Sequence, residues 1–101
     1  MQIVFSVQAL RHSFPIPVAP GIAIDRFVNS YIVFGETITL VDTGVAGSED
    51  RIFDEIRAAG RDPAEIVLIV LTHSHPDHIG AARAIREKTR CSVAAHPAER
   101  A

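Results

Sequence analysis

This sequence has a single cysteine. It has no excess of basic over acidic residues and no long apolar run. The one cysteine, Cys91, cannot form an internal disulfide, which is compatible with a reducing compartment. The net charge of -2 disfavours nucleic acid as a partner. No apolar run approaches the roughly 20 residues of a membrane-spanning helix, and the N-terminal stretch lacks the features of a signal peptide. We therefore expect a cytoplasmic protein that does not bind membranes.

The length and composition of the chain are typical of one small globular domain. The 101 residues fit a single domain, residues 1–101, and leave no room for two. Hydrophobic residues make up 48% of the chain and charged residues 22%, which is typical of a globular protein. A hydrophobic core can therefore form.

The first half of the chain predicts strands. Residues 3–10 are apolar enough for a first strand. The three prolines of residues 14–21 predict an extended loop, because proline lacks an N–H group and disfavours a central strand. Residues 29–44 predict a hairpin with a type II′ turn that begins at Gly35. Apolar and polar residues alternate over residues 37–41, as in a half-buried strand.

The second half predicts alternating helices and strands. Ser48 is a candidate N-cap of the first helix and Gly60 its stop. The unbroken apolar run Ile66–Leu71 is typical of a parallel strand covered on both faces. This alternation implies right-handed crossovers and an α/β fold. In chain order we expect a helix, a capped turn, a strand, a helix and a strand, at residues 48–59, 62–65, 66–71, 79–89 and 91–97.

Three of the five histidines and an aspartate follow that apolar run within six positions. Ligands in open α/β sheets collect at the carboxyl ends of strands. An extended loop can aim His73 and His75 to one side, as two nitrogen ligands of a first metal. Asp77 and His78 point apart from that pair and can reach a second metal. Imidazole and carboxylate suit zinc, with iron and manganese as rivals; the other interpretation is a polar loop without a metal.

The pattern His73-x-His75-x-Asp77-His78 after a buried strand resembles the signature of the metallo-β-lactamase superfamily, and residues 28–99 resemble its opening segments in order. The resemblance implies the N-terminal αβ half of an αβ/βα sandwich, a mixed sheet with helices on one face. It also implies two zinc ions held by these four side chains, with Asp77 able to orient the attacking water. Asp42 resembles the aspartate that holds an imidazole ligand in place without touching metal; the alternative is a turn-forming aspartate.

The resemblance also leaves the function open. Family members are longer, and their second half supplies a further histidine, a bridging aspartate and a final histidine that these 101 residues do not contain. One hypothesis is a zinc-dependent hydrolase of a small-molecule ester, thioester, lactam or phosphodiester, lacking the second half of its site. The alternative is a metal-binding or inactive half-domain without turnover. A third is an iron-based redox module.

An incomplete sandwich would also leave one face of the sheet uncovered. We expect a homodimer, or association with the missing C-terminal half, because an apolar face with Ile38 or Leu40 on it would otherwise meet water. His96 is either an additional ligand or a loop histidine that does not bind metal. His12 is expected at the surface, and Cys91 is expected to be a small buried residue.

Overall fold

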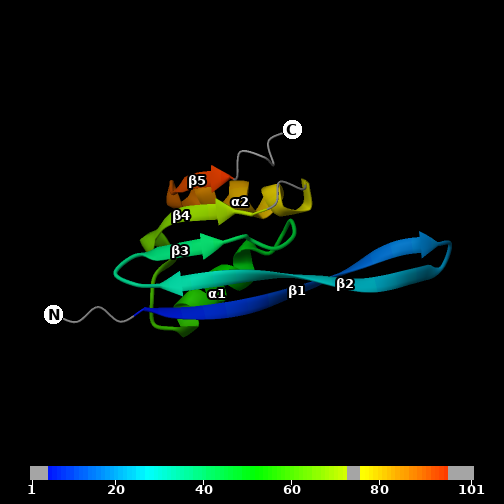
Figure 1. The fold of residues 1–101 in the computed structure, drawn as a ribbon, viewed down its shortest axis with the longest axis horizontal. Helices are drawn as coiled ribbons and strands as arrows, with labels where there is room; N and C mark the ends of the chain where they lie inside the picture. The colour runs from blue at the N-terminus through cyan, green and yellow to red at the C-terminus, as the bar shows by residue number, and fades with distance from the viewer. Residues whose placement is uncertain (1–4, 73–75, 96–101) are drawn as a thin grey trace.

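The computed structural model describes residues 5–72 and 76–95, with the backbone alone for residues 76–80. Within these residues the chain forms one five-stranded sheet in the order β1-β2-β3-β4-β5 (Figure 1). The strands are β1 (Ser6–Ala19), β2 (Ile22–Phe34), β3 (Ile38–Val41), β4 (Ile66–Leu71) and β5 (Ser92–Ala95). The helices are α1 (Glu49–Ala58), the single turn η1 (Pro63–Glu65) and α2 (Pro76–Thr89).

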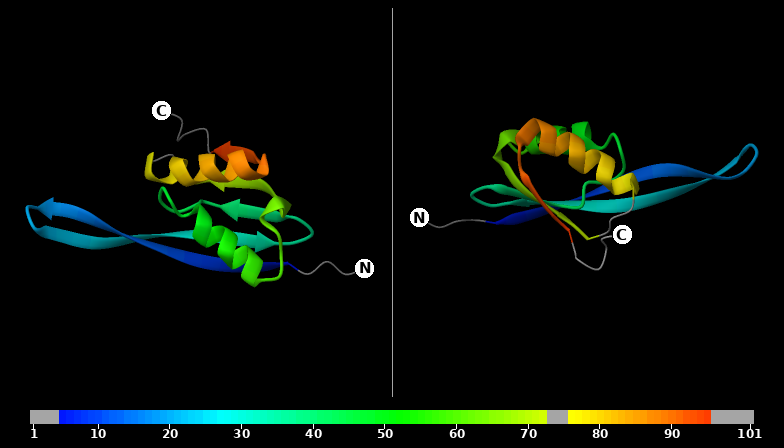
Figure 2. Two further views of the ribbon diagram at one scale, coloured as in Figure 1. Left: turned by 180° about the vertical axis from the view of Figure 1, so that it is seen from behind. Right: turned by 90° about the horizontal axis from the view of Figure 1, so that it is seen from above.

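The sheet is mixed, and both α-helices cover the same face. β1, β2 and β3 are antiparallel, whereas β3, β4 and β5 are parallel. Each parallel connection contains one α-helix: α1 lies between β3 and β4, followed by η1, and α2 lies between β4 and β5. Figure 2 shows both helices on one side of the sheet. The predicted fold class, a mixed sheet with helices on one face, is therefore confirmed.

The proline-rich segment is a strand, so the prediction of a loop at residues 14–21 is wrong. β1 continues to Ala19 and pairs with β2 as one long hairpin, which projects beyond the rest of the molecule (Figure 1). Pro15 and Pro17 are tolerated because β1 is an edge strand, where a missing N–H leaves no ladder bond unmade. The turn contains Gly21 with φ of 75°, a value that favours glycine.

The hairpin of β2 and β3 is confirmed, but its predicted turn is not. Phe34 pairs with Ile38, so three residues form the connection, and Gly35 lacks the positive φ of a type II′ turn. Gly35 lies instead against the ring of the exposed Phe5, and a Cβ at this position would be 2.5 Å from that ring, so Phe5 would have to move.

The helices begin and end close to the predicted residues, but not all of the predicted capping interactions are present. Ser48 precedes α1, but its side chain makes no capping hydrogen bond. Gly60 ends the helix with φ of 78°. The capping box of η1 is present, and a hydrogen bond from Arg61 lowers the pKa of the Glu65 carboxyl that takes part in it. α2 begins at Pro76, three residues earlier than predicted.

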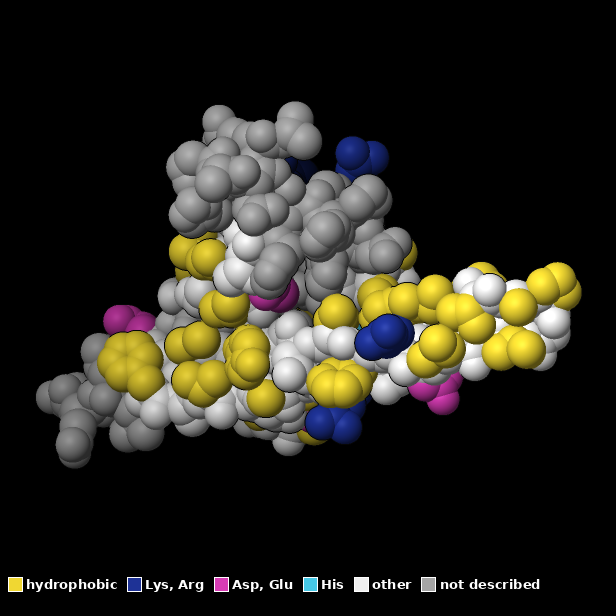
Figure 3. Space-filling view, turned by 45° about the vertical axis from the view of Figure 1, so that its right-hand side comes forward, with side chains coloured by type: hydrophobic (Ala, Val, Ile, Leu, Met, Phe, Trp, Pro, Cys, Tyr) yellow, Lys and Arg dark blue, Asp and Glu magenta, His cyan; other side chains and the backbone are white. Residues whose placement is uncertain are grey.

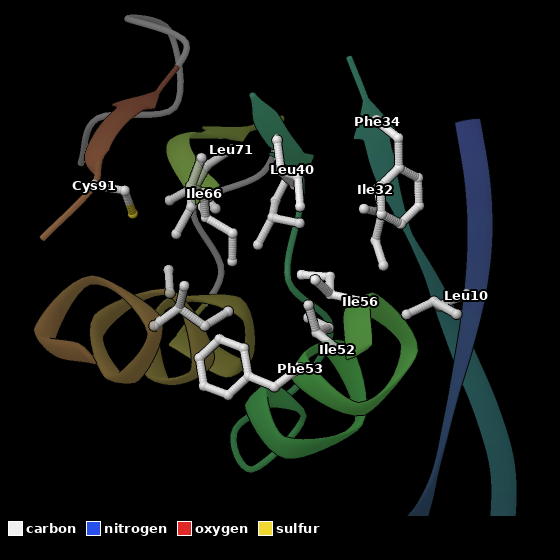
Figure 4. Close-up of a cluster of buried hydrophobic side chains, with 14 residues drawn as sticks. Leu10, Ile32, Phe34, Leu40, Ile52, Phe53, Ile56, Ile66, Leu71 and Cys91 are labelled. Carbon is white, nitrogen blue, oxygen red and sulfur yellow. The ribbon is translucent and has the colours of Figure 1, made fainter. Parts of the chain in front are cut away.

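The core lies between the sheet and the two helices (Figure 4). Ile52 and Ile56 of α1 are fully buried against the sheet. In none of the described parts of the chain is a helix long and apolar enough to cross a membrane. The buried cluster comprises Leu10, Ile32, Phe34, Ile38, Leu40, Ile52, Phe53, Ile56, Ile66, Ile69, Leu71, Ala82, Ile85 and Cys91.

The opposite side of the sheet, which we call the open face, carries no helix within the described residues (Figure 2). Within the described residues β4 is therefore covered on one face and not on both: Ile69 and Leu71 are buried, whereas Leu68 and Val70, which point the other way, are only partly buried. Ile38 and Leu40 both point to the helices, so neither lies on the open face as expected. Strand register places a row of apolar side chains across the open face instead: Ala9, Tyr31, Val41, Val70 and Ala94. Figure 3 shows apolar side chains continuing along the projecting hairpin.

The apolar row on the open face leads us to expect self-association. Exposed apolar patches of this kind mark interaction surfaces, and a standard interface buries roughly 800 Å² of each partner. Size-exclusion chromatography with light scattering at micromolar concentration should give a dimer mass.

A charge on the open face should disrupt that dimer. Tyr31→Lys places an ammonium group in the apolar row and is expected to shift the mass toward the monomer. Ala58→Lys adds the same charge on the exposed surface of α1 and should leave the dimer intact. A parent chain that elutes as a clean monomer, or a Tyr31→Lys variant that remains dimeric, would contradict this prediction.

Candidate metal centre

The parallel strands β3 and β4 end side by side, and their ends are joined through Asp42. Val41 pairs with Val70 at the end of the ladder. The backbone N–H of Asp42 then donates to the carbonyl of Val70 at 2.8 Å. The first residue beyond β3 is thereby attached to β4. This connection lies at the carboxyl ends of the parallel strands, where ligands collect in open α/β folds.

The side chain of Asp42 makes a second connection to the same strand end. Its Oδ1 accepts a hydrogen bond from the backbone N–H of Thr72 at 2.8 Å, and its Oδ2 accepts one from the Thr72 hydroxyl at 2.5 Å. Asp42 is buried and has φ of 58°, a left-handed conformation that aspartate tolerates better than most residues. Both carboxylate oxygens are therefore committed to the residue that follows β4.

This pair of hydrogen bonds determines where the histidine-rich segment begins. Thr72 is the last described residue before position 73, and the chain is described again at Pro76, the first residue of α2. The predicted ligands His73 and His75 lie outside the described residues. Asp77 falls in the first turn of α2, where the backbone alone is described.

The remaining predicted ligand, His78, also lies in the first turn of α2, and its side chain is not described. The assignment of the four ligands therefore stays a prediction, as does the role of Asp42 toward an imidazole. Within residues 5–72 and 81–95, no three His, Cys, Asp or Glu side chains come together as a metal site. His96 lies outside the described residues.

Two residues near this edge were not recognised from the sequence. Thr72 was part of the motif region but had no assigned role, although it is the partner of Asp42. His12 was expected at the surface, and this is wrong: it is 3% exposed. His12 lies two residues after Leu10, so in a strand both point to the same face of the sheet, and this spacing could have indicated its burial. Cys91 is buried, as predicted.

Known proteins are similar to parts of this chain in sequence and in fold. Residues 23–101 match the profile of the Metallo-beta-lactamase superfamily. A probable metallo-hydrolase of Methanocaldococcus jannaschii is 35% identical over 63 residues, which cover 62% of this chain and 30% of that protein. The solved structure of Rm3 metallo-beta-lactamase has a TM-score of 0.64 and 29% identity, over 70% of this chain and 27% of its own. A class B3 di-zinc metallo-beta-lactamase, LRA-12 from an Alaskan soil metagenome, has a TM-score of 0.60 and 27% identity, over 64% of this chain and 25% of its own.

The fold therefore corresponds to part of a metallo-β-lactamase fold, with a histidine-rich segment at the carboxyl end of a parallel strand. The chain belongs to the metallo-β-lactamase superfamily. It spans about a quarter of the length of these solved structures and 30% of the archaeal relative. The activity of the whole proteins is for this reason a matter of proposal.

The bond between Asp42 and Thr72 gives a prediction on stability. Thr72→Val leaves a buried carboxylate oxygen without its hydroxyl donor and should lower the free energy of unfolding by about 1–3 kcal/mol. In an Asp42→Ala background the same substitution should cost much less, because the acceptor is already gone. Urea denaturation of the four proteins of this double-mutant cycle measures the coupling.

Thr39→Val is the matched control. This threonine is half-buried in β3 and makes no part of the connection between the carboxyl ends of β3 and β4. Its replacement should therefore change stability by less than about 0.5 kcal/mol. Additive effects of Thr72→Val and Asp42→Ala would show that the bond does not hold the strand ends together.

Proposed function

We propose that this chain forms the metal-binding half of a zinc-dependent hydrolase of the metallo-β-lactamase superfamily. The observation that supports the proposal most directly is the attachment of Thr72 to Asp42. It holds the chain at the residue immediately before His73, at the carboxyl end of a strand whose core side is fully packed. A metal site requires ligands that start from such a rigid position.

The donor set fits zinc. Three imidazoles and one carboxylate follow β4 within residues 73–78, and nitrogen and carboxylate oxygen are ligands that zinc accepts readily. We assign His73 and His75 to one ion, and Asp77 and His78 to a second. The similarity to a di-zinc metallo-beta-lactamase supports two ions over one. Iron and manganese share these preferences and are the alternatives.

The chemistry proposed is hydrolysis of an ester, thioester, lactam or phosphodiester in a small-molecule substrate. When bound, zinc would lower the pKa of a water molecule to about 7 and polarise the oxygen of the substrate. The residues of this chain would have separate tasks. The histidines would hold the metal, Asp77 would also orient the attacking water, and Asp42 fixes Thr72, the residue before His73.

A second candidate function is metal binding without turnover. Zinc in catalytic sites usually has three protein ligands and one water, whereas each ion here has two assigned ligands. The extent of the similarity, about a quarter of each solved structure, favours this alternative for the 101-residue chain on its own. The third candidate, an iron redox module, would be revealed by colour and by iron in elemental analysis.

Metal content tests the ligand assignment. Elemental analysis after dialysis should find zinc in the parent chain and less zinc in His73→Ala and in Asp77→Ala, because each variant loses a ligand from one ion. His96→Ala also removes an imidazole, and it should keep the zinc content of the parent if His96 is a loop histidine that does not bind metal. Equal metal content in the parent, His73→Ala and Asp77→Ala would show that the assignment is wrong.

Turnover separates the two candidate functions. With two ligands per ion, the purified 101-residue chain should hydrolyse ester, thioester and lactam substrates at rates within about tenfold of free zinc, because a loosely held nucleophile gains little from positioning. Steady-state assays with the zinc-loaded chain measure this. Robust turnover by a demonstrably monomeric chain that disappears in His75→Ala would contradict the expectation and favour a complete enzyme.

A further inference from the structure

His12 lies buried next to the loop that holds the strand ends together, although nothing in the ligand assignment uses it. It belongs to β1, two residues after Leu10 and on the same face of the sheet. Its Nε2 is 2.6 Å from the hydroxyl oxygen of Ser30 in the neighbouring strand β2. Ser30 is itself buried, so this polar pair is enclosed by protein.

The ring of His12 is packed against Gly44. A Cβ built on Gly44 would lie 2.6 Å from Cγ, 2.7 Å from Cδ2 and 2.8 Å from Nδ1 of the imidazole. These separations are shorter than side chains tolerate, so the ring occupies the space that any other residue at this position would need. Gly44 also has φ of 74°, a second reason for glycine here.

Gly44 is the third residue of the loop that begins at Asp42. The residue between them, Thr43, is fully buried, and Asp42 and Gly44 are buried too, so the start of the loop is enclosed. Ser30 precedes Tyr31, which pairs with Val41 at the end of β3. The imidazole, its hydroxyl partner and the start of the loop therefore lie together at the end of the sheet where Thr72 is held.

We infer that His12 is a positioning residue for the metal centre. Its imidazole, oriented by Ser30, supports Gly44 and so keeps Asp42 in the left-handed conformation that meets Thr72. It thereby acts on the ligands through the loop and the strand end, without contact to a metal. This inference rests on the proposed function, because it assigns to His12 an effect on the affinity of residues 73–78 for zinc.

Zinc affinity, measured by competition with a colorimetric chelator, tests the inference. His12→Ala should weaken zinc binding by about tenfold or more, the range seen when groups that orient metal ligands are removed. Ser30→Ala leaves the ring in place without its partner and should weaken binding by a smaller factor, about threefold. If His12→Ala does not fold, Ser30→Ala carries the test alone, and unchanged affinity in it would overturn the inference.

Leu10→Ala is the control for a purely structural effect. It removes a buried side chain from the same strand and the same face, two residues from His12. It should lower the midpoint of urea unfolding while zinc affinity stays within about threefold of the parent, because the loop keeps its support. An equal loss of affinity in Leu10→Ala, or a His12→Ala variant within threefold of the parent, would overturn the inference.

A metal-free measurement separates this inference from the proposed function. Gly44→Ala should destabilise the chain strongly, and His12→Ala should remove part of that loss because the clashing ring is gone. This coupling is expected in the double-mutant cycle whether or not the chain binds zinc. A parent chain that does not bind zinc would refute the proposed function, and additive stabilities would refute the contact on which the role of His12 depends.

Discussion

The hydrogen bonds that Asp42 makes across the ends of β3 and β4 are the constraint on which the candidate site depends. Parallel strands have no tight turn to keep their ends in register, because the chain leaves through a helix before it returns. A buried carboxylate between the two ends replaces that turn. It fixes Thr72 by its backbone and its hydroxyl. The position from which the histidine-rich segment starts is therefore fixed by β3 and β4 together, and not by β4 alone.

The burial of this carboxylate explains why its surroundings are so specific. A buried charge is costly unless hydrogen bonds compensate for it, and Thr72 supplies two of them. Asp42 must also adopt a left-handed backbone to present both oxygens, which only a supported loop can maintain. Gly44 and the His12 ring next to it provide close packing on the other side of that loop.

The sheet itself is asymmetric. On the helix side, fully buried isoleucines of three strands pack against α1 and α2, and this packing holds the strand ends in place. On the open face, a row of apolar side chains has no covering layer within the described residues. Burial of that row against a second layer would stabilise the same strands that hold the site, since sheets are normally covered wherever they are apolar. The stability of the chain and the metal binding that we propose for it would in this way depend on the same strands.

Much of the fold and the location of the site followed from local sequence. The apolar run Ile66–Leu71, the capped turn before it and the helix after it were predictable, because propensity, capping and periodicity all act over a few residues. The family followed from the spacing of histidines and aspartate in residues 73–78. These features are short, and each carries its own chemical reason.

Other features depended on partners far away in the sequence. The prolines of β1 predicted a loop. The segment is nevertheless a strand, because it pairs with β2 on one side and lies at the edge of the sheet on the other. Gly35 lies against the ring of Phe5, thirty positions earlier, and His12 is buried because Gly44, thirty-two positions later, leaves room for its ring. The sequence by itself determined the candidate ligand types, their order and the strand and helix on either side of them. The tertiary structure alone decided which side chains support the loop, because those contacts join residues that no local pattern connects.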